Sequence, residues 1–315
     1  MRAHYPKQPI GSISALSRAL DVEEDLLTHI GANVSTFYRP GPPQPKKDGT
    51  LRITHNAAPE LKGIHRKINK RLLQEVQYPD YLHGSIRVIN DPRSIKTNAA
   101  LHTNQKTILC EDVAGFFDAT TPALVRKVWQ HLFCFPPTVA ELLTKLCTHD
   151  GFLPQGWRCS SYLANLVLWE DEDRLVRNLR CRGFTYSRYV DDMTISAPRF
   201  LSRADKSWVV QSLISTLARN GYRLKRGKHE ILKAAGTMKV NGQIVNGKRP
   251  TLSTKYRNNV RWNVYALQKM HALDASSEEY RSRWESCSGK AIRVASYHER
   301  TGQKLLDQLS AIAPQ

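Results

Sequence analysis

Three aspartates have neighbours and spacings that suit catalysis. Asp191 and Asp192 are adjacent between two apolar segments, and Asp112 ends an apolar run upstream. Adjacent carboxylates repel each other unless a cation lies beside them. Carboxylate oxygens suit Mg²⁺, which keeps several waters and takes substrate phosphate oxygens as further ligands. Two such ions would stabilise the attacking and leaving oxygens of an in-line phosphoryl transfer.

The elements around these aspartates must bring them to one point. Residues 107–113 are predicted to form a buried strand that ends in acids, and 184–196 two short strands around a tight turn. A strand end beside such a turn can gather three carboxylates. An isolated Asp–Asp pair is more often an exposed turn, so the prediction depends on its context. Helices are predicted at 13–30, 58–76, 121–149, 159–180, 206–220 and most of 255–315, with a hairpin at 238–252.

That context resembles a reverse transcriptase. Tyr189-Val190-Asp191-Asp192 resembles the signature hairpin of these enzymes, and Leu153-Pro154-Gln155-Gly156-Trp157 resembles their L-P-Q-G segment. Asp112-Val113-Ala114-Gly115-Phe116-Phe117 resembles the first acidic motif of bacterial members, although Gly115 stands where many relatives have a second Asp. The order and spacing of the three motifs match a polymerase palm.

The resemblance implies an α+β fold with right-hand polymerase architecture. Its expected parts are an N-terminal helical extension, fingers that carry a further N-A-x-x-H segment, a palm, and a hairpin followed by a basic, mostly helical thumb. The boundaries predicted for them are 1–35, 36–106, 107–238 and 239–315.

The resemblance also implies roles for individual residues. The catalytic residues are Asp112, Asp191 and Asp192, which with Val113 would hold two Mg²⁺ ions. A bulky ring at Phe117 would clash with a 2′-hydroxyl and so select deoxynucleotides, unless it is a core residue. The residues expected to contact the dNTP are Lys46, Arg52, Phe117, Gln155 and Lys228.

Several of these nucleotide contacts have alternatives. Lys46 and Arg52 supply positive charge for phosphate oxygens, but the same pair also fits an exposed basic turn. The L-P-Q-G segment also fits a turn that enters a helix. Lys228 would neutralise or protonate the leaving pyrophosphate, and Lys225 and Arg226 are close enough in sequence to take that role.

Two short segments resemble retron reverse transcriptases in particular. Asn98-Ala99-Ala100-Leu101-His102 matches their N-A-x-x-H element, and Val240-Asn241-Gly242 stands where retrons carry V-T-G, with Asn in place of Thr. The alternative for the first segment is a capped turn at a helix. The resemblance predicts RNA binding by both segments, through Asn98, His102, Val240, Asn241 and Gly242.

The charge balance predicts a polyanionic partner. The chain has 47 Lys+Arg and 28 Asp+Glu, a net charge of +19. Residues 201–315 hold 21 basic and 8 acidic side chains, 21 − 8 = +13, whereas residues 1–200 hold 26 and 20, 26 − 20 = +6. We expect the C-terminal third to bind a phosphate backbone, although a basic surface also serves solubility. Its aromatic residues suit either base stacking or a helical core.

The retron resemblance implies a reaction cycle and partners. The enzyme would bind its cognate structured non-coding RNA, prime from the 2′-hydroxyl of a guanosine, and use dNTPs to make a branched RNA–DNA hybrid (msDNA). A host RNase H would remove template, and a separate effector protein would join the complex in anti-phage defence. Alternatives are a group II intron or diversity-generating reverse transcriptase, an RNA-dependent RNA polymerase, or a nucleic-acid scaffold without catalysis.

Composition sets the expected compartment. No run approaches the roughly 18 apolar residues that span a bilayer, and the N-terminus lacks the apolar segment of a signal peptide. The six cysteines are scattered without a C-x-x-C pair, which predicts neither a zinc site nor a disulfide framework. We therefore expect a cytoplasmic protein with no membrane partner.

Overall fold

A four-stranded antiparallel sheet carries the three aspartates. The computed structural model describes residues 2–45, 49, 51–88, 90–273 and 275–314. The strand order is β6-β7-β5-β8, and β5 and β7 pair so that Asp112 lies opposite Asp192. The strands are β5 (Thr107–Asp112), β6 (Thr185–Tyr189), β7 (Asp192–Ala197) and β8 (Glu230–Lys233). The strand predicted at 107–113 and the two strands predicted around a turn at 184–196 are confirmed.

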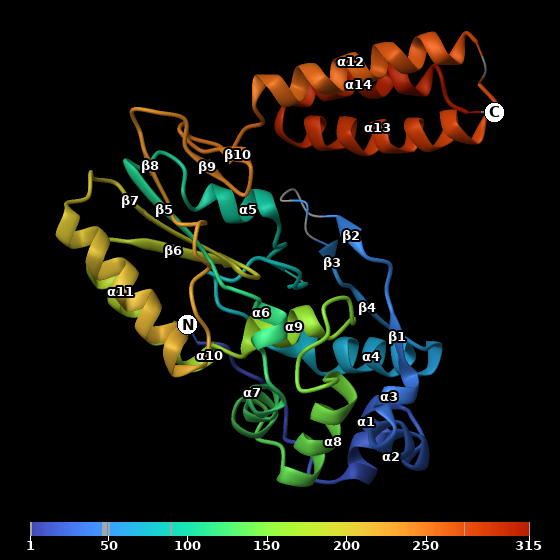
Figure 1. The fold of residues 1–315 in the computed structure, drawn as a ribbon, viewed down its shortest axis with the longest axis vertical. Coiled ribbons are helices and arrows are strands. Elements are labelled where there is room, and N and C mark those ends of the chain that lie inside the picture. Colours follow the sequence, from blue (N-terminus) through green and yellow to red (C-terminus); the bar gives the residue numbers. More distant parts are fainter. Residues whose placement is uncertain (1, 46–48, 50, 89, 274, 315) are drawn as a thin grey trace.

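The two faces of the sheet pack against different hydrophobic clusters. Side chains alternate along a strand, so Leu109 and Ile195 enter the main core while Ile108 faces a small second cluster on the opposite side. Figure 1 shows α10 and α11 on the first side and the short α5 with the β9–β10 hairpin on the second. The elements are α5 (Ile95–Ala100), α10 (Trp169–Cys181), α11 (Arg203–Arg219), β9 (Lys239–Val240) and β10 (Gln243–Ile244).

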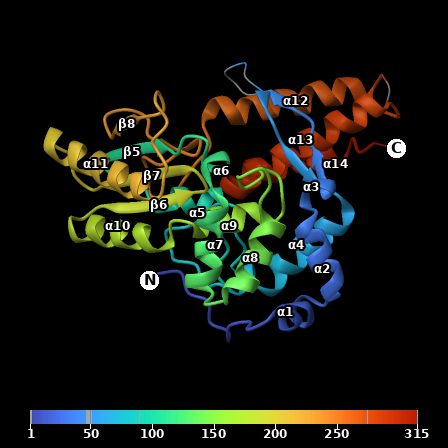
Figure 2. The same cartoon turned by 60° about the horizontal axis from the view of Figure 1, so that its bottom comes forward.

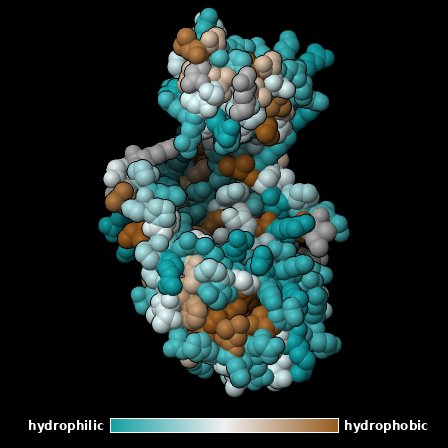
Figure 3. All heavy atoms as spheres, turned by 90° about the vertical axis from the view of Figure 1, so that its right-hand side faces the viewer, coloured by the Kyte–Doolittle hydropathy of each residue, from teal (hydrophilic) through white to brown (hydrophobic). Residues whose placement is uncertain are grey.

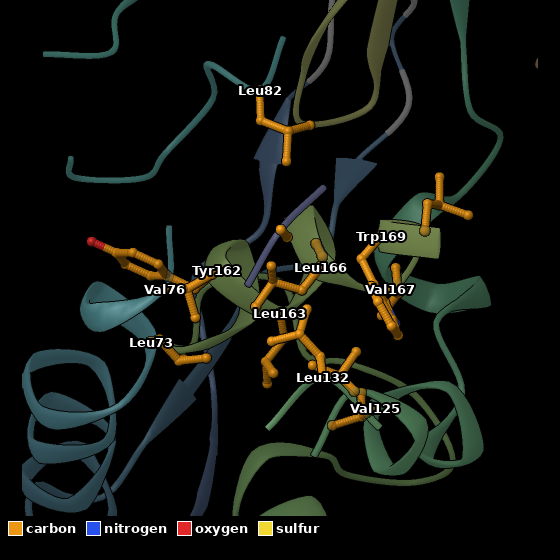
Figure 4. Packing of buried hydrophobic residues seen from close by; sticks show 14 of the residues in the cluster. Leu73, Val76, Leu82, Val125, Leu132, Tyr162, Leu163, Leu166, Val167 and Trp169 are labelled. Carbon is orange, nitrogen blue, oxygen red and sulfur yellow. The ribbon is translucent and has the colours of Figure 1, made fainter. Parts of the chain in front are cut away.

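The main core extends from the sheet into the helices beside it. Figure 4 shows Leu163 and Leu166 of α9 packed toward Val125 and Leu132. The helices here are α6 (Phe116–Ala119), α7 (Pro122–Lys127), a π-helical turn (Val128–Leu132), α8 (Pro137–Cys147) and α9 (Ser160–Leu166).

The predicted fingers consist of paired strands that rest on helices. Two antiparallel pairs, β1–β4 and β2–β3, form an extension from Tyr38 to Ala57. The strands are β1 (Tyr38–Pro40), β2 (Gln44–Pro45), β3 (Leu51–Arg52) and β4 (His55–Ala57). Beside them lie α1 (Ile13–Leu20) and α2 (Glu24–Ala32) of the predicted N-terminal extension, α3 (Val34–Phe37), and α4 (Pro59–Arg71) with a 3₁₀ turn (Leu73–Glu75) of the predicted fingers.

The C-terminal helices form a unit with its own core. They are α12 (Thr254–His271), α13 (Glu278–Tyr297) and α14 (Glu299–Ser310), packed around residues such as Val264, Tyr280 and Leu309. They lie at the opposite end of the molecule from α1 and α2 (Figures 1 and 2). Figure 3 shows this mostly hydrophilic unit above the body, with a hollow between the two.

The helices predicted at 13–30, 58–76, 121–149 and 159–180 are each interrupted, and the first and third of them show a clear local reason. The helix predicted at 13–30 is broken after α1, where Asp21 adopts a left-handed conformation (φ 55) that ends the helix. The helix predicted at 121–149 is interrupted before α8, where Pro136 is extended and Pro137 starts the next helix. In the described part of the chain, no helix is long and apolar enough to cross a membrane.

Candidate active site

The turn between β6 and β7 presents the acidic residues. Val190 has φ 61, an uncommon conformation for a β-branched residue, and the turn carries Asp191 and Asp192 to the end of β5. The backbone N–H of Val113 donates to the carbonyl of Asp191 at 3.1 Å, which ties the turn to the end of β5. Asp112 and Asp192 therefore lie side by side, with Asp191 next to them in the chain.

The acidic cluster is electrostatically unfavourable. Burial and the neighbouring Asp191 and Asp112 charges raise the pKa of Asp192 to about 6. Lys228 relieves part of this repulsion, because its Nζ donates to Asp112 Oδ2 at 2.6 Å. That hydrogen bond raises the pKa of Lys228. The cluster is thus a place where positive charge is stabilised.

A buried ion pair supports the turn between β6 and β7. Arg188 is fully buried and makes two hydrogen bonds to Glu172, Nε to Oε1 at 2.5 Å and Nη2 to Oε2 at 2.7 Å. Its Nη1 donates to the carbonyl of Val190 at 2.8 Å. Gly84 packs against the turn so closely that a Cβ there would lie 2.4 Å from Val190 Cγ2. The strained turn is therefore braced on two sides.

A cavity of about 470 Å³ opens beside the aspartates. It is lined by Phe117, Gln155, Gly156, Tyr189, Asp191 and Asp192. Phe117 is partly exposed in it, whereas Phe116 is buried in the main core. Phe117 thus lines the cavity and Phe116 belongs to the core, and the role of Phe117 in sugar selection stays a prediction.

The L-P-Q-G segment is fixed by contact with β4. The N–H of His55 donates to the carbonyl of Gln155 at 2.9 Å, and Trp157 Nε1 donates to the carbonyl of Asn56 at 2.9 Å. Gly156 has φ 121, and a Cβ there would lie 2.4 Å from the His55 carbonyl oxygen. Glycine is required by both the conformation and the close approach, so the turn holds Gln155 at the cavity.

The remaining predicted nucleotide contacts lie partly beyond what the structure describes. Lys46 is outside the described residues. Arg52 belongs to β3, but its side chain is outside them too. Both stay predictions.

The segments predicted to bind RNA are mostly internal. Asn98, His102 and Val240 each have 0% exposure, so their side chains have no surface to offer RNA. His102 bridges two strands of the sheet, with Ser196 Oγ at 2.7 Å from Nδ1 and Ser187 Oγ at 2.7 Å from Nε2. The structure gives these three residues a supporting position in place of the predicted RNA contact.

The turn of the β9–β10 hairpin is different. Asn241 is partly exposed and Gly242 exposed, so their RNA contact stays a prediction.

Two residues of this site were not identified from the sequence. Arg188 occupies an inward position of an otherwise apolar and small-residue strand, and a charge there requires a buried partner. The alternation of FTYSRYV was the available signal. It does not identify Glu172, which comes from α10.

Comparisons with known proteins agree with this geometry. Residues 44–262 match the reverse transcriptase (RNA-dependent DNA polymerase) family. The chain is 32% identical to the Retron Se72 reverse transcriptase of Salmonella heidelberg, over 97% of this chain and 80% of that one. It is 29% identical to the Retron Ec48 reverse transcriptase of Escherichia coli, over 97% and 77%.

A solved foamy viral protease–reverse transcriptase, in complex with double-stranded DNA, is more distant. It matches at 15% identity and a TM-score of 0.39, over 99% of this chain and 53% of that one. By the family match and the two retron relatives, this chain belongs to the retron reverse transcriptases and is an RNA-directed DNA polymerase.

Proposed function

We propose that Asp112, Asp191 and Asp192 hold two Mg²⁺ ions, with the Val113 carbonyl as a further ligand, and that dNTPs are joined to DNA in the adjoining cavity. The observation that carries this proposal is the convergence of Asp191, Asp192, Phe117 and Gln155 on one cavity, with Asp112 paired to Asp192 across the sheet. Reverse transcriptases generally use divalent metals.

The chemistry of the donor set fits Mg²⁺. Within the described residues no three His, Cys, Asp or Glu side chains are grouped so as to hold a metal by themselves. Mg²⁺ needs only one or two carboxylates when waters and substrate phosphates complete its shell. The bound ions would supply charge stabilisation to the attacking and leaving oxygens. The pKa of Asp192 is raised because burial and the neighbouring carboxylates destabilise its charge, and a bound cation would stabilise that charge.

The other cavity residues would orient the nucleotide. Gln155 would contact the nucleotide or the primer end, and Phe117 would lie under the sugar and exclude a 2′-hydroxyl. Lys228 already lies at Asp112 and would turn its ammonium to the leaving pyrophosphate when substrate is bound. Lys46 and Arg52 would supply further positive charge to the triphosphate.

The retron relatives support a specific cycle. The enzyme would recognise its cognate structured RNA, begin DNA at the 2′-hydroxyl of a guanosine, and stop with a branched RNA–DNA hybrid (msDNA). Host RNase H would remove copied template, and an effector protein held by the complex would act in anti-phage defence. The resemblance to two named retron enzymes over most of the chain carries this step.

The C-terminal unit would hold the RNA. A hollow of about 430 Å³ between α12 and α14 is lined by Arg261, Tyr265, Arg300 and Lys304. Trp262 is 65% exposed and Tyr265 56%, which suits stacking on bases, whereas Tyr280 is fully buried in the helical core. We assign residues 239–315 to the hairpin and thumb, 107–238 to the palm, 36–106 to the fingers and 1–35 to the N-terminal extension.

The experiment is to express the full chain with its adjacent non-coding RNA and isolate the nucleic acid that co-purifies. We expect DNA joined to RNA by a 2′,5′ linkage, which a debranching enzyme releases as free DNA. DNA that starts only from the 3′ end of an annealed strand would contradict the retron cycle. No DNA from a folded, RNA-bound enzyme supplied with Mg²⁺ and dNTPs would contradict the catalytic assignment.

A further inference from the structure

Both retron-like segments reach the catalytic hairpin. Asn98 Nδ2 donates to Asn241 Oδ1 at 2.6 Å, and Asn241 Nδ2 donates to Asp192 Oδ2 at 3.2 Å. The three side chains come from α5, the β9–β10 turn and β7. Two hydrogen bonds therefore connect α5 to a predicted metal ligand.

The first member of this chain is fixed by its surroundings. Asn98 is fully buried in α5, whose start is closed by a capping box between Ser94 and Thr97. Gln243 Nε2 donates to the carbonyl of Ile95 at 3.1 Å, which ties the helix to β10. The helix and the hairpin are therefore held together around the Asn98 side chain, which is fully buried and donates to Asn241.

The second member is placed by its turn. Asn241 has φ 47 and Gly242 φ 77, the left-handed pair of a tight Asn–Gly hairpin turn. A carboxylate only accepts hydrogen bonds, so Asp192 requires the NH₂ group of Asn241 on its side. The Asn241 oxygen then faces Asn98, which donates to it. Each partner thus fixes the orientation of the Asn241 amide.

We propose that Asn241, oriented by Asn98, is a positioning residue for Asp192. Its hydrogen bond to one carboxylate oxygen restricts rotation of the Asp192 side chain and directs the carboxylate toward the cation. Partners of this kind typically change metal affinity or activity 10–100-fold when removed. The inference rests on the proposed role of Asp192 as a metal ligand. This positioning role differs from the RNA contact that the sequence predicts for Asn241.

The test compares two asparagines of one hairpin. Asn241→Gly removes the amide and keeps a residue that favours the left-handed turn. Asn246→Ala is the matched control, because Asn246 also stabilises the hairpin, through Met238 N and the Gly236 carbonyl at 2.8 Å each. The readouts are Mn²⁺ binding to the RNA-free full chain by electron paramagnetic resonance, the Mg²⁺ dependence of primer extension on a generic annealed template, and RNA affinity without divalent cations.

We expect Asn241→Gly to weaken Mn²⁺ binding and raise the Mg²⁺ concentration for half-maximal extension, each by about tenfold. RNA affinity should stay within about twofold, and Asn246→Ala should leave the metal readouts unchanged. Wild-type metal binding in Asn241→Gly, or an equal loss in Asn246→Ala, would overturn the proposal. Loss of RNA affinity with normal Mn²⁺ binding would return Asn241 to RNA recognition.

Two further variants separate the possible failures. If Asn241→Gly lowers the melting temperature more than the control does, the same readouts are taken on Asn241→Asp, and that variant then tests the positioning role. It keeps the size and the turn, but it places a carboxylate where the donor was. If Asp192→Asn binds Mn²⁺ and extends primers like wild type, the proposed metal site fails. If only the Asn241 variants behave like wild type, that site stands and the positioning role fails.

Discussion

Arginine is used in two different ways in the four-stranded sheet and in the C-terminal helical unit. Arg188 has 0% exposure, its guanidinium bonds to Glu172 and to the Val190 carbonyl, and it braces the turn between β6 and β7. Arg261 and Arg300 are exposed at the rim of a hollow in the C-terminal unit. A buried, fully bonded charge fixes geometry, whereas an exposed one remains available to a phosphate.

The comparison predicts that the largest loss of stability follows from breaking the buried pair. Glu172→Ala leaves Arg188 without its counter-charge and should reduce the free energy of unfolding by about 3–5 kcal/mol. Urea denaturation measures it. Glu170→Ala, in the same helix, removes a surface pair with Lys127 at 3.6 Å and should cost less than about 1 kcal/mol. Similar losses in both variants would contradict the bracing role.

The buried His102, which bridges two strands of the sheet, should also make stability depend on pH. Burial lowers the pKa of His102 to about 3, from an ordinary value near 6.5. Below pH 6.5 the unfolded chain binds a proton that the folded chain does not, so stability falls as the pH falls toward 3. From pH 7.5 to 5.5 this group should cost about 1.4 kcal/mol.

The matched variant is His102→Gln, which cannot titrate. Its unfolding free energy should fall less than that of the wild type between the two pH values. Burial also lowers the pKa of His83, to about 4, but His83 is present in both proteins and cancels in the difference. An identical pH dependence in the two proteins would show that His102 is not buried in its neutral form.

The cavity should distinguish adjacent phenylalanines. Phe117→Ala opens space at the sugar and should raise ribonucleotide incorporation relative to deoxynucleotide incorporation by about tenfold. Phe116 lies in the core, so Phe116→Leu should lower the free energy of unfolding without changing sugar choice. Single-nucleotide extension with dNTP and rNTP in competition measures the ratio. Unchanged discrimination in Phe117→Ala would place the sugar filter elsewhere.

The exposed arginines should have the smallest effect, and one that depends on salt. Replacing Arg261 and Arg300 with Ala should reduce the slope of log affinity for RNA against log salt by up to about 0.7–0.9 per lost phosphate contact. The control Arg18→Ala removes one charge from an exposed position of α1, so its slope change is compared with half of the change in the double variant. A slope changed equally by the control would mean that the C-terminal hollow is not a phosphate contact.

The two regions also differ in how far the sequence predicts them. The acidic hairpin is local, since its apolar strands and adjacent aspartates lie within fifteen residues, and its fold was predicted correctly. Asn98 contacts Asn241, which is 143 residues away, and no periodic pattern encodes a contact between two polar side chains at that separation. The burial of His102 was missed for the same reason, because its partners Ser187 and Ser196 lie on distant strands.

The central claim is that DNA synthesis depends on the aspartates while RNA binding does not. It is tested most directly in the double variant Asp191→Asn with Asp192→Asn. DNA synthesis and RNA affinity are measured on the same preparation of full-length protein. We expect synthesis to fall by a factor of about 10³ or more, because several kcal/mol of charge stabilisation are lost, while RNA affinity stays within about twofold. Synthesis near the wild-type rate, or RNA affinity lost together with synthesis in a folded protein, would contradict this account.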